Sequence, residues 1–300
     1  METRSPVANL IISLRPDQWT KNLIVFAALV FAVKLHDPAA LALASAAFLI
    51  FCALSGSVYL INDVSDREAD RLHPLKRLRP IASGALGTGT AIGWAIGLSV
   101  VALAAAYALR PLFAVAAAAY LALFALYTHT LKHVVILDVM SIAIGFVLRA
   151  VAGGLVIGVP VSDWLLVCTI LLALFLGLAK RRHELTALAD GASGHRRILE
   201  EYDPYLLDQM IAIVAAATLV VYIIYCASPE TAERFGTRLL VLTTPFPIYG
   251  IFRYLYLVHR KHGGGSPSDL LLRDRPLLSC VALWGIAVVT IIYRPYASYL

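Results

Sequence analysis

Residues 62–84 read NDVSDREADRLHPLKRLRPIASG, and the rest of the chain is interpreted outward from them. The stretch carries three aspartates, Asp63, Asp66 and Asp70, followed by a basic run that ends at Arg79. Uncharged apolar segments long enough to cross a bilayer lie on both sides of it. An acidic cluster followed by a basic one at the edge of a membrane is suited to holding a metal-bound polyphosphate.

The composition indicates an integral membrane protein. Hydrophobic residues make up 60% of the 300 residues and charged residues 15%, whereas soluble domains average about 45–50% and 25%. The apolar runs exceed about 18 residues and do not alternate with period two, which favours helices and excludes an outer-membrane barrel. We therefore expect an all-α integral membrane protein, with residues 1–300 forming a single polytopic membrane domain.

Nine transmembrane helices are expected. Breakers such as Pro38, Pro111, Pro160 and Pro229 separate the apolar runs. The expected spans are 18–34, 40–62, 86–109, 111–128, 135–158, 162–182, 207–227, 238–258 and 277–293.

The basic residues predict the orientation. With the N-terminus inside, 18 of the 25 lysines and arginines lie in inner segments and five lie in outer ones. This imbalance puts the N-terminus and the connections at 63–85, 129–134, 180–206 and 259–276 in the cytoplasm, in a multi-pass protein of the cell membrane. Because these residues flank spans, the net charge of +6 indicates membrane orientation and contact with anionic head groups or phosphates, not nucleic acid.

The aspartates predict a metal site. Asp63, Asp66 and Asp70 stand at i, i+3 and i+7, which would place them within an arc of roughly 60° on one helical face. Three carboxylates so close repel one another unless a cation is present, and oxygen ligands favour Mg²⁺ shared with phosphate oxygens. The alternative is a solvated acidic helix end paired locally with Arg67 and Arg71.

The basic run admits two interpretations. Lys76, Arg77 and Arg79 could serve only as positive charges beside a membrane span. That role does not explain the turn that begins at Arg79-Pro80, which would hold one arginine rigidly before the next span. Because arginine binds phosphate in bidentate fashion, we expect Arg79 and Lys76 to contact phosphate.

Several polar residues lie where lipid would not tolerate them. Lys21 and Asn22 begin the first apolar run, and Asp138 and Arg149 lie eleven residues apart on one face of the fifth. Ionisable groups at membrane depth face the bundle interior and tend to be functional. Lys21 could instead extend to the membrane surface, and Arg149 could pair with a buried carboxylate or carbonyl.

At this point the chain resembles the UbiA superfamily of intramembrane prenyltransferases, and within it the decaprenyl-phosphate phosphoribosyltransferase branch. The motif N-D-x-x-D-x-x-x-D followed by R-P-I-A-S-G carries the superfamily resemblance. Further stretches, taken together, favour the branch. They are RPDQWTKN at 15–22, Tyr127 with Leu131-Lys132, Asp138, RAVAGG at 149–154, KRRHEL at 180–185 and DRPL at 274–277.

The resemblance implies a UbiA-like bundle with its active site at the cytoplasmic mouth. The implied reaction is the Mg²⁺-dependent transfer of a 5-phosphoribosyl group from phosphoribosyl diphosphate to a polyprenyl phosphate, for the cell-wall arabinan precursors of arabinogalactan. The implied catalytic residues are Asp63, Asp66, Asp70, Lys21 and Arg79, with the three aspartates on the metal. The implied substrate-binding residues are Asn22, Asn62, Lys76, Tyr127, Lys132, Asp138, Arg149, Lys180, Arg181, Arg182, Glu184 and Arg275.

One departure separates the chain from enzymes that use prenyl diphosphates. Such enzymes usually carry a second Asp-rich motif after the sixth span, whereas here Asp190 stands alone near the basic cluster of Lys180, Arg181 and Arg182. This favours a lipid monophosphate acceptor, although flank charge explains the cluster equally well. A prenyltransferase acting on an aromatic or other acceptor is the alternative, and a small-solute or lipid transporter is another. The sequence leaves a homo-oligomer open.

Overall fold

Proline and glycine set the boundaries of a chain whose described elements are all helical. The computed structural model describes residues 5–189, 201–260 and 267–297. In chain order the elements, with η marking 3₁₀ helices, are α1 (Pro6–Leu14), η1 (Pro16–Phe26), α2 (Ala27–Phe31), α3 (Pro38–Ser65), α4 (Arg67–Leu72), η2 (Lys76–Leu78), α5 (Thr88–Leu109), α6 (Pro111–His129), η3 (Leu131–His133), α7 (Leu137–Ile157), α8 (Asp163–Ala189), α9 (Pro204–Ala227), α10 (Pro229–Phe235), η5 (Leu239–Thr243), α11 (Pro245–Arg260), α12 (Pro267–Arg273) and α13 (Arg275–Ala297).

Several helices begin with the same pattern, in which a residue with a side-chain oxygen caps the helix and a proline follows it directly. Asp37 accepts hydrogen bonds from the N–H groups of Ala39 and Ala40 at 3.0 and 3.1 Å, with Pro38 at the first position of α3. Asp203 caps α9 in the same way. The cap satisfies a free backbone donor, and the fixed φ of proline suits the first turn.

Seven helices within the described ranges are long and apolar enough to cross a membrane: α3, α5, α6, α7, α8, α9 and α13. The other two expected spans, 18–34 and 238–258, are each divided between two shorter helices, η1 with α2 and η5 with α11. The chain is therefore a multi-pass membrane protein, and the count of nine spans stays a prediction. Two helices extend beyond the expected spans, α3 to Ser65 and α8 to Ala189.

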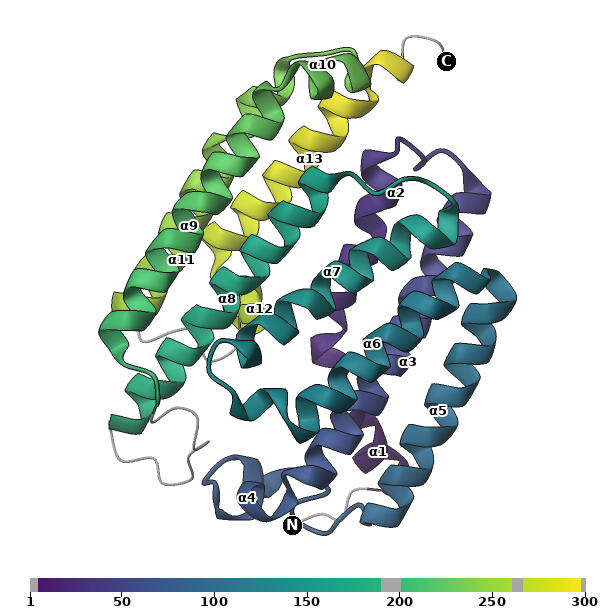
Figure 1. Ribbon diagram of the computed structural model, residues 1–300, viewed down its shortest axis with the longest axis vertical. Helices are drawn as coiled ribbons and strands as arrows, with labels where there is room; N and C mark the ends of the chain where they lie inside the picture. Colours follow the sequence, from purple (N-terminus) through teal and green to yellow (C-terminus); the bar gives the residue numbers. More distant parts are fainter. Residues whose placement is uncertain (1–4, 190–200, 261–266, 298–300) are drawn as a thin grey trace.

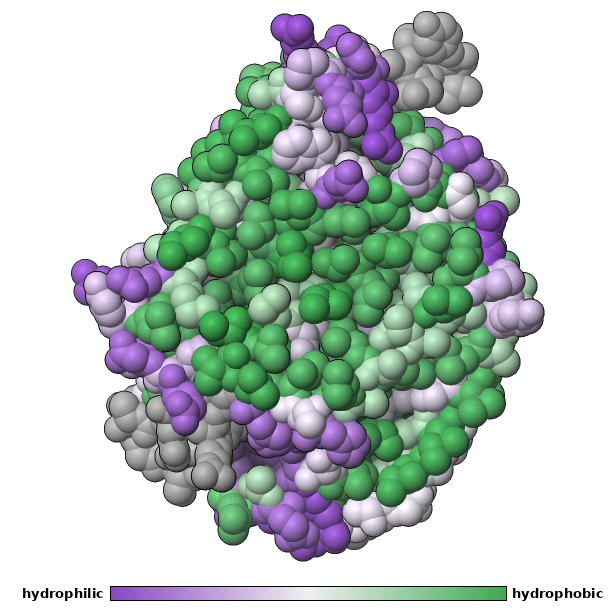
Figure 2. All heavy atoms as spheres, in the orientation of Figure 1, coloured by the Kyte–Doolittle hydropathy of each residue, from purple (hydrophilic) through white to green (hydrophobic). Residues whose placement is uncertain are grey.

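The connections gather at two opposite ends of the bundle. Figure 1 shows α1, α4 and the α6–α7 connection at the lower end, and α10, the α7–α8 connection and the C-terminus at the upper end. Figure 2 shows a broad hydrophobic band across the middle of this face, with hydrophilic surface at both ends. The described segments that carry most of the basic residues thus share one end.

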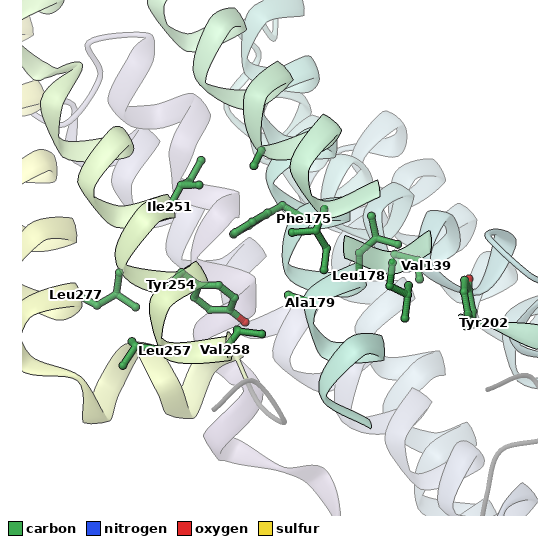
Figure 3. Close-up of a cluster of buried hydrophobic side chains, with 13 residues drawn as sticks. Val139, Phe175, Leu178, Ala179, Tyr202, Ile251, Tyr254, Leu257, Val258 and Leu277 are labelled. Atoms are coloured by element: carbon green, nitrogen blue, oxygen red, sulfur yellow. The ribbon is translucent and has the colours of Figure 1, made fainter. Parts of the chain in front are cut away.

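Helix α7 is central. Half of its most apolar stretch is buried, compared with 17% in α5. On one side it packs with α3, α6 and η1 around Phe51, Phe113 and Tyr120. On the other, Val139 of α7 joins a cluster built from α8, α9, α11 and α13, which includes Phe175, Tyr202 and Tyr254 (Figure 3). The two halves of the bundle therefore meet on α7.

A glycine on α7 permits the close approach of η1. A Cβ atom placed at Gly153 would lie 2.1 Å from the backbone oxygen of Val25, which is itself fully buried. Because the obstructing atom belongs to the backbone, no side-chain rotation can relieve the overlap. Gly153 thus fixes how deeply the first polar segment, with Lys21 and Asn22, enters the bundle.

We expect Gly153→Ala to destabilise the protein, because overpacking of this kind costs about 1–3 kcal/mol or more. Thermal unfolding in detergent measures the effect as a lower Tm. Gly93→Ala on α5 is the matched control, since no atom lies within 4 Å of a Cβ there. Equal Tm values for the two variants would contradict the close approach.

Candidate active site

The Asp-rich segment lies at the lower end of the bundle in Figure 1, where α3 ends and α4 begins. Asp63 and Asp70 are 2% and 4% exposed. Nη1 of Arg79 donates to Asp63 Oδ1 at 3.1 Å and to Asp70 Oδ2 at 2.6 Å, so one nitrogen joins both carboxylates. A turn holds Arg79 in place, with Arg79 N–H donating to the Lys76 carbonyl and the Arg79 carbonyl accepting from Ser83 N–H.

The three aspartates do not share one continuous helical face, and this expectation was wrong. Helix α3 ends at Ser65, and Asp66 has φ −92° and ψ 5°, outside the helical region. This break turns α4 away from the axis of α3, so Asp63 and Asp70 meet on Arg79 while Asp66 points to a different cation. The spacing rule fails because it assumes an unbroken helix.

A second arginine neutralises Asp63. Nη2 of Arg15 lies 2.5 Å from Asp63 Oδ1, and its guanidinium stacks over the Tyr59 ring at 4.7 Å. Arg15 joins α1 to η1 with a left-handed backbone, φ 54° and ψ 64°. It was not among the residues expected at the site. Its position directly before Pro16, at the head of the first apolar run, was the available signal.

Asp66 is held by a lysine and an asparagine. Nζ of Lys132 lies 2.7 Å from Asp66 Oδ1, and Nδ2 of Asn62 donates to Asp66 Oδ2 at 3.0 Å. Lys132 is only 5% exposed. Tyr127, near the end of α6 before this turn, is also buried. The structure thus brings Lys132 and Asn62 together with the acidic cluster.

The donor set fits a hard divalent cation. Oδ1 of Asn62 is buried and has no hydrogen-bond partner among the described residues, although its own amide group donates to Asp66. Oxygen atoms of this kind, with a few carboxylates, are the ligands that Mg²⁺ takes when substrate phosphates complete its shell. No three carboxylate, imidazole or thiol side chains in the described part of the chain converge as a finished metal site. The carboxylates are paired with cations in the structure.

A separate polar network lies inside the bundle. Nε of Arg149 donates to Asn22 Oδ1 at 2.7 Å, and its Nη2 donates to the Tyr120 hydroxyl at 2.6 Å. The guanidinium also lies 4.5 Å from the centre of the Tyr120 ring. Asn22 and Arg149 therefore contact each other, which satisfies two buried polar groups. Lys21, next to Asn22, forms no salt bridge with any residue that the structure describes.

Asp138 belongs to a third network, although it shares the buried side of α7 with Arg149. Its Oδ2 accepts from Arg181 Nε at 2.6 Å, and its Oδ1 accepts from the Tyr202 hydroxyl at 2.8 Å. Asp138 and Arg181 are 0% and 2% exposed, so this ion pair is fully desolvated. Burial raises the pKa of Tyr202, and its hydrogen bond to Asp138 raises it further, so the phenol stays protonated and donates.

The basic cluster of α8 is already paired. Lys180 lies 3.8 Å from Glu184, Arg181 also contacts Glu184, and Arg182 contacts Asp208 of α9. These residues lie within α8, not in a loop, because the helix continues to Ala189.

Three further expected residues have different outcomes. Arg275 begins α13 and is exposed. Lys76 is half-buried beside His73, whose Nδ1 accepts from Lys76 N–H at 3.3 Å. Burial, and next the charge of Lys76, lower the pKa of His73. Asp190 lies outside the described residues, so the structure does not test the expected lack of a second Asp-rich motif.

Comparisons with known proteins identify the family. The model of the UbiA prenyltransferase family matches residues 23–272. The chain is 36% identical over 291 residues to the decaprenyl-phosphate phosphoribosyltransferase of Mycolicibacterium smegmatis, covering 93% of this chain and 90% of that protein. It is 32% identical over 299 residues to the protein of the same name from Corynebacterium glutamicum, covering 97% and 90%.

A solved structure agrees on the fold. A UbiA homolog from Archaeoglobus fulgidus bound to DMAPP and Mg²⁺ matches with a TM-score of 0.71 at 19% identity, covering 95% of this chain and 99% of that one. The resemblance expected from residues 62–84 is thereby confirmed, and the family is one of enzymes, not transporters. The chain belongs to the UbiA prenyltransferase family.

Proposed function

We propose that this enzyme transfers a 5-phosphoribosyl group from phosphoribosyl diphosphate to a polyprenyl phosphate of the decaprenyl type, releasing diphosphate, in a Mg²⁺-dependent reaction. The names of relatives that are 32–36% identical over more than nine-tenths of the chain support this activity. The proposed product is a precursor for cell-wall arabinan, and the proposed location is the cytoplasmic face of the cell membrane.

The observation that carries the proposal is the pairing of acids with bases at the site. Arg15, Arg79 and Lys132 each contact one of the aspartates or two of them. A diphosphate needs both signs of charge, because a divalent cation must be held by acids while the remaining phosphate oxygens are bound by bases. Few structural purposes require two buried acids, a third that is half-buried, and three bases from separate segments at one end of the bundle.

The chain's own residues would act by holding and neutralising the donor. Asp63, Asp66, Asp70 and Asn62 Oδ1 would hold the cation, and Arg15, Arg79 and Lys132 would bind phosphate oxygens of the donor. A bound Mg²⁺ supplies further neutralisation of the departing diphosphate. Positioning and charge complementarity would therefore lower the barrier without a covalent intermediate.

The reaction itself needs no general base. The bond between ribose C1 and the diphosphate oxygen breaks, and its electron pair leaves with the diphosphate. An anionic oxygen of the lipid phosphate then forms the new bond to C1, so no proton has to be removed. We propose that Lys21 binds the lipid phosphate. In support, it forms no salt bridge with a described residue, and it stands at the head of the first apolar segment.

The contacts of the other basic residues change the roles that we propose for them. Arg181 and Arg182 are paired with Asp138 and Asp208, which lie outside the Asp-rich segment. We therefore propose structural roles for these two arginines, in contrast to the bases that contact the Asp-rich segment itself. Lys180, Glu184 and Arg275 stay candidates at the rim of the site. Asn22 and Arg149, joined by their hydrogen bond, stay candidates for substrate binding inside the bundle.

The runner-up is prenyl transfer from a prenyl diphosphate to an aromatic or other acceptor. The Archaeoglobus fulgidus structure of the same fold was determined with DMAPP and Mg²⁺. The same aspartates would hold that diphosphate. Supplying a prenyl diphosphate and measuring diphosphate release separates the two activities.

The metal role has a direct test with purified protein, labelled phosphoribosyl diphosphate and a polyprenyl phosphate. We expect chelation of Mg²⁺, or either Asp63→Asn or Asp66→Asn, to lower the rate by about a hundredfold or more, which corresponds to a few kcal/mol of barrier. Asp163→Asn, at the start of α8 at the opposite end of the bundle, should leave the rate unchanged. Equal rates with Mg²⁺ and with chelator would refute the metal role.

The orientation is testable with two exposed glutamates at opposite ends of the bundle, Glu68 of α4 and Glu233 of α10. We expect a membrane-impermeant maleimide to label Glu233→Cys in intact cells, because its end faces outward. Glu68→Cys should be labelled only after the membrane is permeabilised. The unaltered protein is the control for the native cysteines, and the opposite labelling pattern would contradict a cytoplasmic site.

A further inference from the structure

The turn between α6 and α7 contains a strained residue. Ile136 has φ 70° and ψ −44°, a conformation that β-branched residues rarely adopt. Such backbone persists only where the surroundings hold it in place, and it is found mainly at functional sites. Two features of the turn therefore matter: the group that holds the backbone of Ile136, and the side chain that the turn places near the aspartates.

The Tyr202 hydroxyl is the side-chain group that contacts the turn at Ile136 N–H. Ile136 N–H donates to the Tyr202 hydroxyl oxygen at 2.8 Å, and the same hydroxyl donates to Asp138 Oδ1 at 2.8 Å. Asp138 is fixed in turn by Arg181 of α8. Tyr202 is 4% exposed, so water cannot readily replace either bond. Tyr202, two residues before α9, is thus tied to the backbone before α7.

The turn presents Lys132 to the acidic cluster. Lys132 lies in η3, four residues before Ile136, and its Nζ contacts Asp66 Oδ1 at 2.7 Å. Backbone hydrogen bonds make the intervening turn compact, with Val134 N–H donating to the Leu131 carbonyl at 3.2 Å and Asp138 N–H to the Val134 carbonyl at 3.1 Å. A change at Ile136 would therefore be transmitted to Lys132.

We propose that Tyr202 is a positioning residue, whose hydroxyl fixes the strained turn at Ile136 and thereby holds Lys132 against Asp66 and the donor's diphosphate. Tyr202 does not touch substrate in this account, and it acts through Lys132. The inference rests on the proposed function for its effect on rate. Its geometric content, that the hydroxyl keeps Lys132 in place, stands without it.

The chain offers a matched control in the same hydrophobic cluster. Figure 3 shows Tyr202 and Tyr254, both buried in that cluster; Tyr202 lies in the connection before α9 and Tyr254 lies in α11. The Tyr254 hydroxyl has no hydrogen-bond partner among the described residues. Tyr202→Phe and Tyr254→Phe remove the same atom and keep the same ring, but only the first removes contacts to the turn.

The first arm of the test does not depend on activity. Lysine side chains in native membranes are acylated with an amine-reactive reagent, and the labelling rates of Lys132 and Lys21 are followed by mass spectrometry. We expect Tyr202→Phe to raise the rate at Lys132 roughly tenfold or more while Lys21, in the separate Asn22–Arg149 region, is unchanged. Tyr254→Phe should change neither. An unchanged Lys132 rate in Tyr202→Phe, or an equal rise in both variants, would overturn the proposal.

The second arm is a double-mutant cycle on the transferase rate. Tyr202→Phe should lower kcat/KM roughly tenfold or more in the unaltered chain, but by no more than about twofold in the Lys132→Met background. Losses that multiply independently would mean that Tyr202 does not act through Lys132. If the unaltered protein makes no lipid-linked phosphoribose, the proposed function fails, and the labelling arm still decides the role of Tyr202.

Discussion

Three carboxylates at the edge of a membrane must be neutralised, and the site depends on how this chain does it. Asp63 and Asp70 share one nitrogen of Arg79, Asp63 also contacts Arg15, and Asp66 contacts Lys132. An unpaired carboxylate at such burial would lose several kcal/mol of solvation, so the cations are as necessary to the fold as the acids are to the site. The bases come from three segments far apart in the sequence, and their convergence ties those segments together.

The same requirement recurs deeper in the bundle. Arg149 is satisfied by Asn22 and Tyr120, and Arg181 is satisfied by Asp138. Each buried pair joins helices that the apolar packing alone would leave free to slide, because hydrophobic contacts are not directional. α7 carries a member of both pairs and also Gly153, which admits η1. Helix α7 therefore holds the first segment, the end that carries the aspartates and the second half of the bundle in register.

The sequence predicted the class of fold, because apolar composition and run length leave few alternatives to membrane helices. It also pointed to Asn62, Lys132 and Arg79 as site residues, and the structure places all three in contact with the aspartates, although their roles toward substrate stay predictions. It did not predict the break at Asp66, since helical spacing describes only unbroken helices. Arg15 was missed because its partner Asp63 lies 48 residues away. Arg181 looked like its neighbours Lys180 and Arg182, because only the packing of α8 on α7 distinguishes a buried charge from one at the surface.

The central claim is that the acidic cluster binds a sugar diphosphate and that the acceptor is a lipid phosphate. The most direct measurement is the mass of the lipid made by membranes that contain this protein, supplied with phosphoribosyl diphosphate, decaprenyl phosphate and Mg²⁺. The account predicts a new lipid whose mass equals that of decaprenyl phosphate plus one phosphoribosyl group, with diphosphate released in equal amount. The claim is contradicted if no such lipid forms with any polyprenyl phosphate while the same membranes consume a prenyl diphosphate.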